Sequence, residues 1–208
     1  CHVAERIFSA WTMCTAGPSL NFAESIDTVT LNLREIQPTV FFAVPRIWER
    51  LYAGVHIRGN DATRFKKALF NFGIRLARAI GKEKARNGGN HTAKSRVFSW
   101  IGEPLVFRAI KERIGLRRCR YSASGAAAIA PEVLEFFMGI GVPVFELYGM
   151  TENAAVATCN FAGRNKLGTV GEPYADIGLR LDPETGEIQT KHPGVFVGYW
   201  NKPDKTAE

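Results

Sequence analysis

The sequence contains no run of eighteen consecutive apolar residues, although 46% of its 208 residues are hydrophobic. A helix that crosses a bilayer needs about 20 such residues, so no membrane span is predicted. The four cysteines have neither the spacing of a metal site nor a paired arrangement, and we expect reduced thiols. No signal peptide is expected, because the chain opens on Cys1-His2 without a basic-then-apolar start. These absences predict a cytoplasmic globular protein.

The apolar pattern of the first half predicts one strand and three helices. Thr39–Val44 is rich in β-branched and aromatic residues, which indicates a buried strand, and a helix should follow from Pro45 to about Val55. A second helix, ended by Gly88-Gly89, is predicted because apolar residues recur at helical spacing between basic ones. Those apolar residues are Phe65, Leu69, Phe72, Leu76 and Ile80. A third helix over Val97–Arg113 is expected to kink or break at Pro104.

The second half predicts a βαβ unit followed by short strands. Cys119–Ser122 and Val142–Leu147 read as strands, and Pro131–Met138 reads as the helix that joins them in parallel. From Val170 onward the pattern changes to short strands, with Asp182–Gly186 as a hairpin turn. Because open α/β sheets bind ligands at the carboxyl ends of their strands, we expect a site after each strand of the βαβ unit. Trp11, Trp48 and Trp100 are expected to anchor the core.

The stretch after the last of these parallel strands carries the most chemistry. Tyr148 offers a flat face for a base, and Gly149 lets backbone approach a ligand closely. Thr151 can donate a hydrogen bond to a phosphate oxygen, and Glu152 is a hard oxygen ligand suited to Mg²⁺. As an alternative, Thr151 is a helix N-cap with Glu152 in the first turn. The stretch predicts a nucleotide-plus-metal site.

The run Glu146-Leu147-Tyr148-Gly149-Met150-Thr151-Glu152 resembles the Tyr-Gly-x-Thr-Glu signature of the adenylate-forming enzymes. This superfamily includes acyl-CoA synthetases, luciferases and peptide-synthetase adenylation domains. Three more stretches follow the order of the family: Ser124–Ala127 with Pro131-Glu132, then Gly168–Pro173, and a strand-rich run from Gly186 to Thr206. Ala128 stands where the family usually has proline.

Other stretches are similar to one branch of that superfamily. His2–Arg6, Gln37–Arg50 and Leu105–Gly115 look like the long-chain fatty acyl-CoA synthetases. Leu147, which precedes the signature tyrosine, is similar to the bubblegum-type branch. The resemblance therefore implies ATP-dependent activation of a long-chain fatty acid to acyl-AMP, and then transfer to CoA with release of AMP.

The resemblance also implies a set of site residues. Thr151, Glu152 and His2 would be catalytic, with Glu152 as the Mg²⁺ ligand. The ATP site would comprise Ser124, Gly125, Ala126, Ala127, Glu146, Leu147, Tyr148, Gly149, Met150 and Thr151. From its own residue type alone, His2 is equally explained as an ordinary core or surface residue.

The fold implied is the large N-terminal domain of an adenylate-forming enzyme. Residues 1–167 would form its α/β part, with a basic helical insertion at about 58–115, and residues 168–208 would begin a β-rich subdomain. The phosphate loop of the family would precede His2 and its mobile C-terminal domain would follow Glu208. We therefore expect a piece of a longer enzyme, inactive or nearly so by itself.

Two other functions stay open. One is an adenylate-forming enzyme for another carboxylic acid, and the other is a non-catalytic nucleotide- or lipid-binding module. The intact Thr151-Glu152 pair argues against the second, because a decayed site has no need for a metal carboxylate.

Basic residues are concentrated in one segment. Between Arg58 and Arg120 there are 17 lysines and arginines and four acidic residues, whereas the whole chain has a net charge of +7. Such a segment can contact an anionic membrane peripherally, bind the phosphates of CoA, or form a solvated helix face. Nucleic acid is disfavoured as a partner, because no recognised nucleic-acid-reading module accompanies the charge.

Overall fold

The computed structural model describes residues 3–60 and 63–207, and the chain divides into two compact units. The α/β unit comprises Asn21–Glu146 and Asn160–Gly171. The terminal unit comprises residues up to Leu20, Leu147–Cys159 and the chain from Glu172 onward. Within the described parts, no helix is both long enough and apolar enough to cross a membrane.

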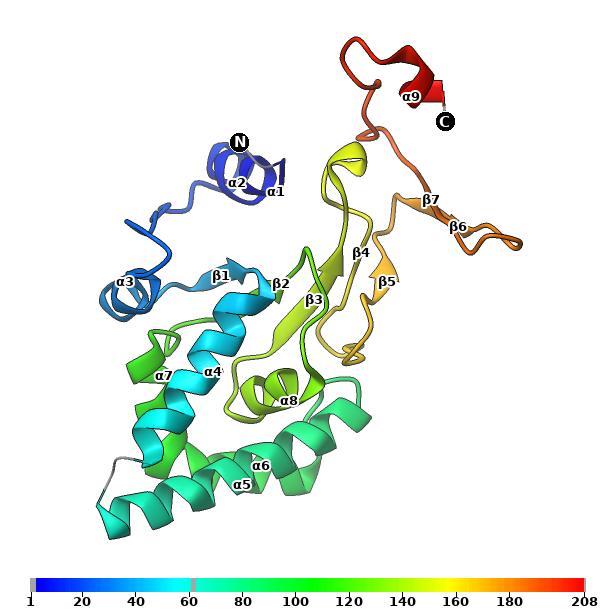
Figure 1. Ribbon diagram of the computed structural model, residues 1–208. Coiled ribbons are helices and arrows are strands. Elements are labelled where there is room, and N and C mark those ends of the chain that lie inside the picture. The colour runs from blue at the N-terminus through cyan, green and yellow to red at the C-terminus, as the bar shows by residue number, and fades with distance from the viewer. Residues whose placement is uncertain (1–2, 61–62, 208) are drawn as a thin grey trace. The chain divides into compact units, whose positions relative to one another are not determined.

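The α/β unit is built from helices around a parallel sheet (Figure 1). Its elements are α3 (Val29–Ile36), β1 (Val40–Ala43), α4 (Pro45–Asn60), α5 (Arg64–Arg86), α6 (Ala93–Gly102), the π-helix η2 (Glu103–Phe107), α7 (Arg108–Ile114), β2 (Tyr121–Ser124), α8 (Pro131–Gly139) and the start of β3 (Val144–Tyr148).

The predicted parallel βαβ unit is confirmed as β2-α8-β3. Strand β2 lies between β1 and β3, and Ser124 is in register with Ala43 on one side and Glu146 on the other. Strand β2 begins two residues later than predicted, so Ser124 ends the strand instead of opening the loop. The run Ser122-Ala123-Ser124 has little strand propensity, but it is buried between two apolar strands that supply its backbone partners.

An aromatic cluster joins the sheet to its helices. The Trp48 side chain in α4 is fully buried and makes edge-to-face contacts with Phe41 of β1 and Phe137 of α8. Phe136 also packs against Phe137 and against Tyr52. The prediction for Trp48 is confirmed. Trp11 and Trp100, also predicted as core residues, are 68% and 79% exposed, so that prediction is wrong for both.

The predicted amphipathic helix is confirmed as α5, but its buried face is displaced from the prediction. Of the predicted apolar residues, Ile80 is fully buried and Leu69 and Leu76 are half-buried, whereas Phe65 and Phe72 are exposed. The buried residues of α5 are Gly73, Ile74, Ala77, Ile80, Gly81 and Lys84. Of these, Ala77 and Gly81 lie against the backbone of α8, and Gly73 lies against Val106 of η2. Small residues define this face because the two helices approach until their backbones touch, which large side chains prevent.

Two helix predictions needed correction in length or form. Helix α4 continues to Asn60, beyond the predicted end near Val55. Around Pro104 the third predicted helix changes to the π-helical segment η2 between α6 and α7. Proline lacks an N–H and obstructs the ordinary helical hydrogen bond, and a π segment accommodates this disruption without ending the helix.

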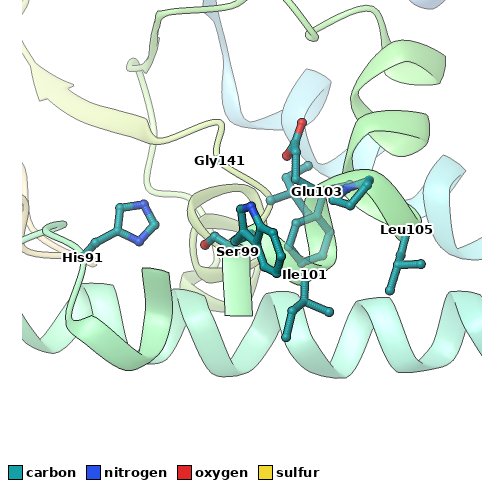
Figure 2. Close-up of a pocket in the computed structure, with 11 residues that line it drawn as sticks. His91, Ser99, Ile101, Glu103, Leu105 and Gly141 are labelled. Atoms are coloured by element: carbon teal, nitrogen blue, oxygen red, sulfur yellow. The ribbon is translucent and has the colours of Figure 1, made fainter. Parts of the chain in front are cut away.

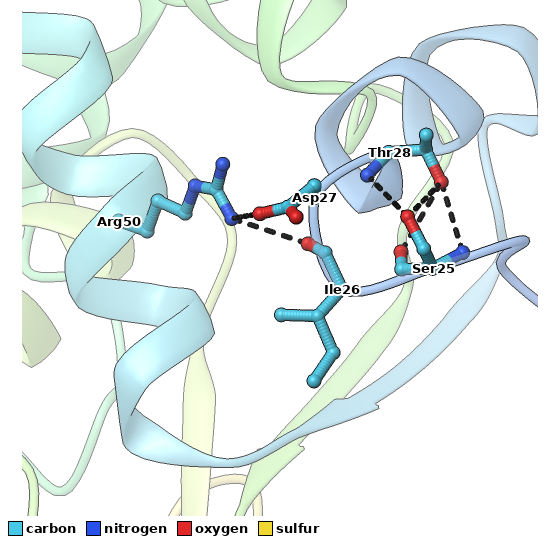
Figure 3. A network of polar contacts seen from close by, with 5 residues as sticks. All are labelled: Ser25, Ile26, Asp27, Thr28 and Arg50. Atoms are coloured by element: carbon cyan, nitrogen blue, oxygen red, sulfur yellow. Dashed lines mark hydrogen bonds and ion pairs between the residues drawn. The ribbon is translucent and has the colours of Figure 1, made fainter.

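The loop before α3 is fastened to α4 by Arg50 (Figure 3). The Arg50 guanidinium donates to the Ile26 carbonyl at 3.1 Å and lies 3.5 Å from the Asp27 carboxylate. The Ser25 backbone N–H donates to the Thr28 hydroxyl at 3.0 Å. The Asp27 side chain is almost fully exposed, so this ion pair contributes about 1 kcal/mol or less.

A buried lysine near the end of α5 has no carboxylate partner among the described residues. Lys84 is 6% exposed, and its Nζ lies 3.3 Å from His91 Nε2. The neighbouring Glu83 carboxylate instead accepts a hydrogen bond from Thr92. Burial lowers the pKa of Lys84, because a desolvated ammonium ion is unfavourable.

We expect Lys84→Met to raise the free energy of unfolding by about 1 kcal/mol at pH 7, because an apolar chain of similar length replaces a buried cation. The gain should shrink as pH rises. Above the lowered pKa the folded protein holds a neutral Lys84, and above the unfolded pKa of about 10.4 neither state is charged. Urea unfolding at pH 7 and pH 10 measures this. A loss of stability at both pH values would contradict it.

The terminal unit contains short elements: α1 (Val3–Glu5), the π-helix η1 (Arg6–Trp11), α2 (Thr12–Ala16), the 3₁₀ turn η3 (Thr151–Asn153), β4 (Thr158–Cys159), β5 (Glu172–Pro173), β6 (Gly178–Leu181), β7 (Ile188–Lys191) and α9 (Pro203–Ala207). The predicted hairpin is confirmed between β6 and β7. Asp182 Oδ1 accepts hydrogen bonds from the N–H groups of Glu184 and Thr185, which is the usual way an aspartate closes such a turn.

Candidate functional site

The predicted site residues fall into both compact units, so each group is described separately. Ser124, Gly125, Ala126, Ala127 and Glu146 belong to the α/β unit. Leu147, Tyr148, Gly149, Met150, Thr151 and Glu152 belong to the terminal unit. His2 lies outside the described residues.

In the α/β unit, the site group begins at the carboxyl end of β2. The Ser124 side chain is 1% exposed, and its hydroxyl has no hydrogen-bond partner among the described residues. The next residues are small, and Ala126 has a positive φ of 72°, so the chain turns sharply after the strand. Ala126 and Ala127 are exposed. A buried unpaired hydroxyl beside an exposed small-residue turn can donate to a ligand atom that enters there.

Glu146 occupies the neighbouring strand and is 7% exposed. Its Oε2 accepts a hydrogen bond from the Gly168 N–H at 2.9 Å. Burial raises the pKa of the Glu146 carboxyl, and the bond from Gly168 opposes this in part. The Asn160 side chain binds the same turn, since it accepts from Lys166 N–H and its amide donates to the Thr169 carbonyl. Glu146 therefore connects the end of β3 to the Gly168 turn.

In the terminal unit, the chain after β3 forms a compact turn. Gly149 lies against the backbone of Ala155, where a Cβ would be 2.2 Å from the Ala155 carbonyl carbon, so no side chain fits there. The Met150 carbonyl accepts from Ala155 N–H at 2.7 Å, and the Met150 N–H donates to Asn153 Oδ1 at 2.8 Å. Ala154 and Ala155 have positive φ values of 58° and 59°. These contacts hold the turn in one conformation.

Thr151 and Glu152 begin the 3₁₀ turn η3. Met150 is the N-cap, so the alternative role predicted for Thr151 as a helix N-cap is wrong. The side chain of Thr151 is exposed. Asn153, by contrast, is buried and bonds back to Met150. The polar capping function is thus carried by Asn153, and the Thr151 hydroxyl stays at the surface.

The Glu152 carboxylate is bonded by a residue that lies far from it along the chain. Oε1 accepts a hydrogen bond from the Tyr199 hydroxyl at 2.6 Å, and the Glu152 carbonyl accepts from Phe196 N–H at 2.8 Å. The bond from Tyr199, followed by the residue's own backbone N–H, lowers the pKa of Glu152, so the carboxylate is ionised at neutral pH. Among the described residues, no lysine, arginine or histidine forms an ion pair with it.

This carboxylate fits a divalent cation held mainly by a substrate. Residues 3–60 and 63–207 contain no group of three or more His, Cys, Asp or Glu side chains that would enclose a metal ion. Mg²⁺ is commonly held by one or two carboxylates together with waters and substrate phosphates, and a single ionised, accessible carboxylate suits that arrangement. Tyr199, which completes this part of the site, had no role in the sequence prediction, because it lies 47 residues away from Glu152.

A separate pocket of about 780 Å³ lies between α6, η2 and the turn after α8 (Figure 2). Most of its wall is apolar, from Trp100, Ile101, Leu105, Phe107 and Ile140, with His91, Ser99 and Glu103 as polar groups. The Glu103 carboxylate pairs with Lys111 at 2.8 Å. No residue of the predicted site lines this pocket.

The chain is similar to known fatty-acid–CoA ligases along its whole length. A Mycobacterium tuberculosis protein whose name describes a fatty-acid–CoA ligase is 33% identical over 210 residues, which cover 100% of this chain and 36% of that protein. A long-chain-fatty-acid–CoA ligase of Gallus gallus, ACSBG2, is 30% identical, with 100% of this chain and 28% of that protein covered. The chain therefore spans about a third of the length of these relatives.

Solved structures share the fold. MatB from Rhodopseudomonas palustris superposes with a TM-score of 0.59 at 22% identity, covering 99% of this chain and 32% of that chain. A benzoate CoA ligase from Burkholderia xenovorans gives 0.53 at 20% identity, covering 87% and 28%. The predicted α/β fold is confirmed. The model of the AMP-binding enzyme family matches residues 1–200, and the chain belongs to that family.

Proposed function

We propose that the protein containing this chain is an ATP-dependent long-chain fatty acid–CoA ligase. The observation that carries the proposal is the similarity of the entire chain to proteins named as fatty-acid–CoA ligases. The long chain acyl-CoA synthetase 6 of Arabidopsis thaliana is a further relative, 33% identical over 222 residues. The signature turn and the accessible Glu152 carboxylate add chemical support.

The reaction explains why such a site is needed. A fatty-acid carboxylate attacks the α-phosphorus of ATP, and pyrophosphate leaves, so anionic groups are brought together. Catalysis then depends on positioning and on neutralising charge. The CoA thiol next attacks the carbonyl carbon of the acyl-adenylate, and AMP leaves.

A separate role is proposed for each of the predicted site residues. In the terminal unit, Tyr148 would offer its ring to the adenine base. In the α/β unit, the turn of Ser124–Ala127 would bind nucleotide, with the Ser124 hydroxyl, which has no partner among the described residues, as a donor. The exposed Thr151 hydroxyl would donate to a phosphate oxygen. Gly149 would line the acyl path, and His2 would orient the acyl carboxylate. Glu152 would hold Mg²⁺, which neutralises phosphate charge when it is bound.

ATP–pyrophosphate exchange by the full-length protein tests this function. We expect exchange that rises only with long-chain acids in a series from acetate to palmitate and beyond. Exchange with an aryl or short-chain acid would support the proposed mechanism and contradict the proposed substrate. No exchange with any acid would favour a nucleotide- or lipid-binding module.

We also infer a peripheral contact with anionic membrane through exposed side chains of the segment α6-η2-α7. Val97, Trp100 and Leu105 are large apolar side chains that are 55%, 79% and 49% exposed. Exposed basic residues lie on the same helices: Lys94, Arg96, Arg108 and Arg113. Aromatic and apolar side chains flanked by cations suit the interface of an anionic bilayer, where a poorly soluble acyl substrate also resides.

Vesicle co-sedimentation measures this contact. We expect binding to phosphatidylserine-containing vesicles at low salt, weaker binding in 0.5 M salt, and a several-fold loss in Trp100→Ala. Trp11→Ala, which removes another largely exposed tryptophan outside this segment, is the control and should bind like the unmodified protein. Binding that is indifferent to both salt and Trp100 would refute the inference.

A further inference from the structure

Glu152 is held by a segment that lies far from it in the sequence. The Tyr199 hydroxyl donates to Glu152 Oε1 at 2.6 Å, and Phe196 N–H donates to the Glu152 carbonyl at 2.8 Å. One contact fixes the side chain and the other fixes the backbone. Both sides of this contact belong to the terminal unit.

The segment that carries Tyr199 is itself held in place. The rings of Phe196 and Tyr199 pack edge to face with centroids 4.8 Å apart. The Tyr199 N–H donates to the Thr206 hydroxyl at 3.0 Å, and that hydroxyl donates to the Lys202 carbonyl at 2.9 Å. The tyrosine hydroxyl is therefore presented to Glu152 from a fixed backbone.

The hydrogen bond leaves the carboxylate able to bind a cation. The bond from Tyr199 uses one acceptor site on Oε1, and an ionised carboxylate has about four such sites on its two oxygens, so acceptor sites remain for a cation. A phenol donor also does not neutralise the carboxylate. A donor that orients a metal-binding carboxylate generally strengthens metal binding, by about 10- to 100-fold.

We propose that Tyr199 is a positioning residue, which orients the Glu152 carboxylate for the divalent cation bound with ATP. This inference rests on the proposed function, and it assigns a role to a tyrosine outside the signature turn. Tyr199 touches neither substrate nor metal in this role, since it acts through Glu152.

Direct cation binding gives the first test. Mn²⁺ replaces Mg²⁺ as a paramagnetic probe, and electron paramagnetic resonance measures its binding to the full-length protein with a non-hydrolysable ATP analogue. We expect about tenfold weaker Mn²⁺ binding in Tyr199→Phe, because only the hydroxyl is removed.

Exchange kinetics give the second test. The Mg²⁺ concentration for half-maximal rate should rise by a similar factor, while the maximal rate at saturating Mg²⁺ stays within about twofold.

Two variants serve as controls. Tyr52→Phe removes a tyrosine hydroxyl that accepts from Arg78 in the α/β unit, and it should leave Mn²⁺ binding unchanged. Phe196→Leu removes the ring that packs on Tyr199 but keeps the backbone N–H bonded to Glu152, so its effect should be smaller than that of Tyr199→Phe.

The outcomes separate this inference from the proposed function. If exchange activity is present and Tyr199→Phe binds Mn²⁺ normally, the positioning role is refuted and the ligase function stands. Tighter binding in Tyr199→Phe would also refute it, because the hydroxyl would then compete with the cation. Absence of exchange in the unmodified protein would count against the proposed function, while the Mn²⁺ measurement would still decide whether Tyr199 acts on Glu152.

Discussion

Replacing Glu152 by glutamine in the full-length protein is expected to lower the rate of ATP–pyrophosphate exchange by roughly a hundredfold or more. Glutamine has nearly the same shape, and its amide oxygen can still accept the hydrogen bond from Tyr199. The turn should therefore keep its structure and lose only the negative charge. A loss of this size is typical when one group that stabilises transition-state charge is removed.

The matched control is Glu184→Gln, which removes an exposed carboxylate in the β6–β7 hairpin. This variant should keep the full exchange rate. Equal rates for Glu152→Gln and the unmodified enzyme at limiting Mg²⁺ would show that Glu152 does not hold the cation. A loss that excess Mg²⁺ restores would assign Glu152 to cation affinity, and a loss that persists would assign it to the chemical step.

Gly81→Ala is expected to lower the free energy of unfolding by about 2 kcal/mol. A Cβ on Gly81 would lie 1.9 Å from the Glu135 carbonyl oxygen in α8, and one on Gly139 would lie 1.9 Å from the Ala77 carbonyl oxygen in α5. Both obstacles are backbone atoms, so the helices must move apart. Overpacking of this kind is destabilising by about 1–3 kcal/mol or more, which exceeds the roughly 1 kcal/mol that alanine gains in a helix.

Gly54→Ala in α4 is the control for this prediction. No atom lies within 4 Å of a Cβ built on Gly54, so only the helix propensity changes. Urea unfolding should show this variant more stable by about 0.5–1 kcal/mol. If both glycine variants were stabilised, the contact between α5 and α8 would have space for a Cβ at Gly81, and the prediction would be wrong.

The local elements that the sequence predicted are those with strong local signals. Pro131 at the start of α8 and Gly139 and Gly141 near its end bracket a helix between two apolar runs. Asp182 and Gly186 likewise mark the β6–β7 turn. In each case the turn or cap chemistry depends on residues within a few positions, so tertiary contacts did not need to be known.

The sequence predictions were wrong where contacts between elements far apart in the chain determine which residues are buried or paired. The buried face of α5 includes Ala77 and Gly81 because α8 approaches closely there, whereas the sequence pattern favoured the large residues Phe65 and Phe72. Small residues have weak hydrophobicity, so periodicity alone does not identify a face built for close contact. Strand β2 begins later than predicted for a related reason, because its small residues have little strand propensity and form a strand only by pairing with β1 and β3.

The sequence by itself determined the family and the parallel βαβ unit. These follow from short segments whose order and chemistry are readable along the chain. The sequence's prediction of a nucleotide-and-metal site in the turn from Tyr148 to Glu152 remains a proposal. Only the tertiary structure decided that Tyr199 bonds to Glu152 and that Glu146 supports the Gly168 turn. It also decided that the buried Ser124 hydroxyl has no partner within residues 3–60 and 63–207. Each of these depends on the partner a polar group meets after folding, and a hydrogen bond across tens of residues leaves no periodic signal in the sequence.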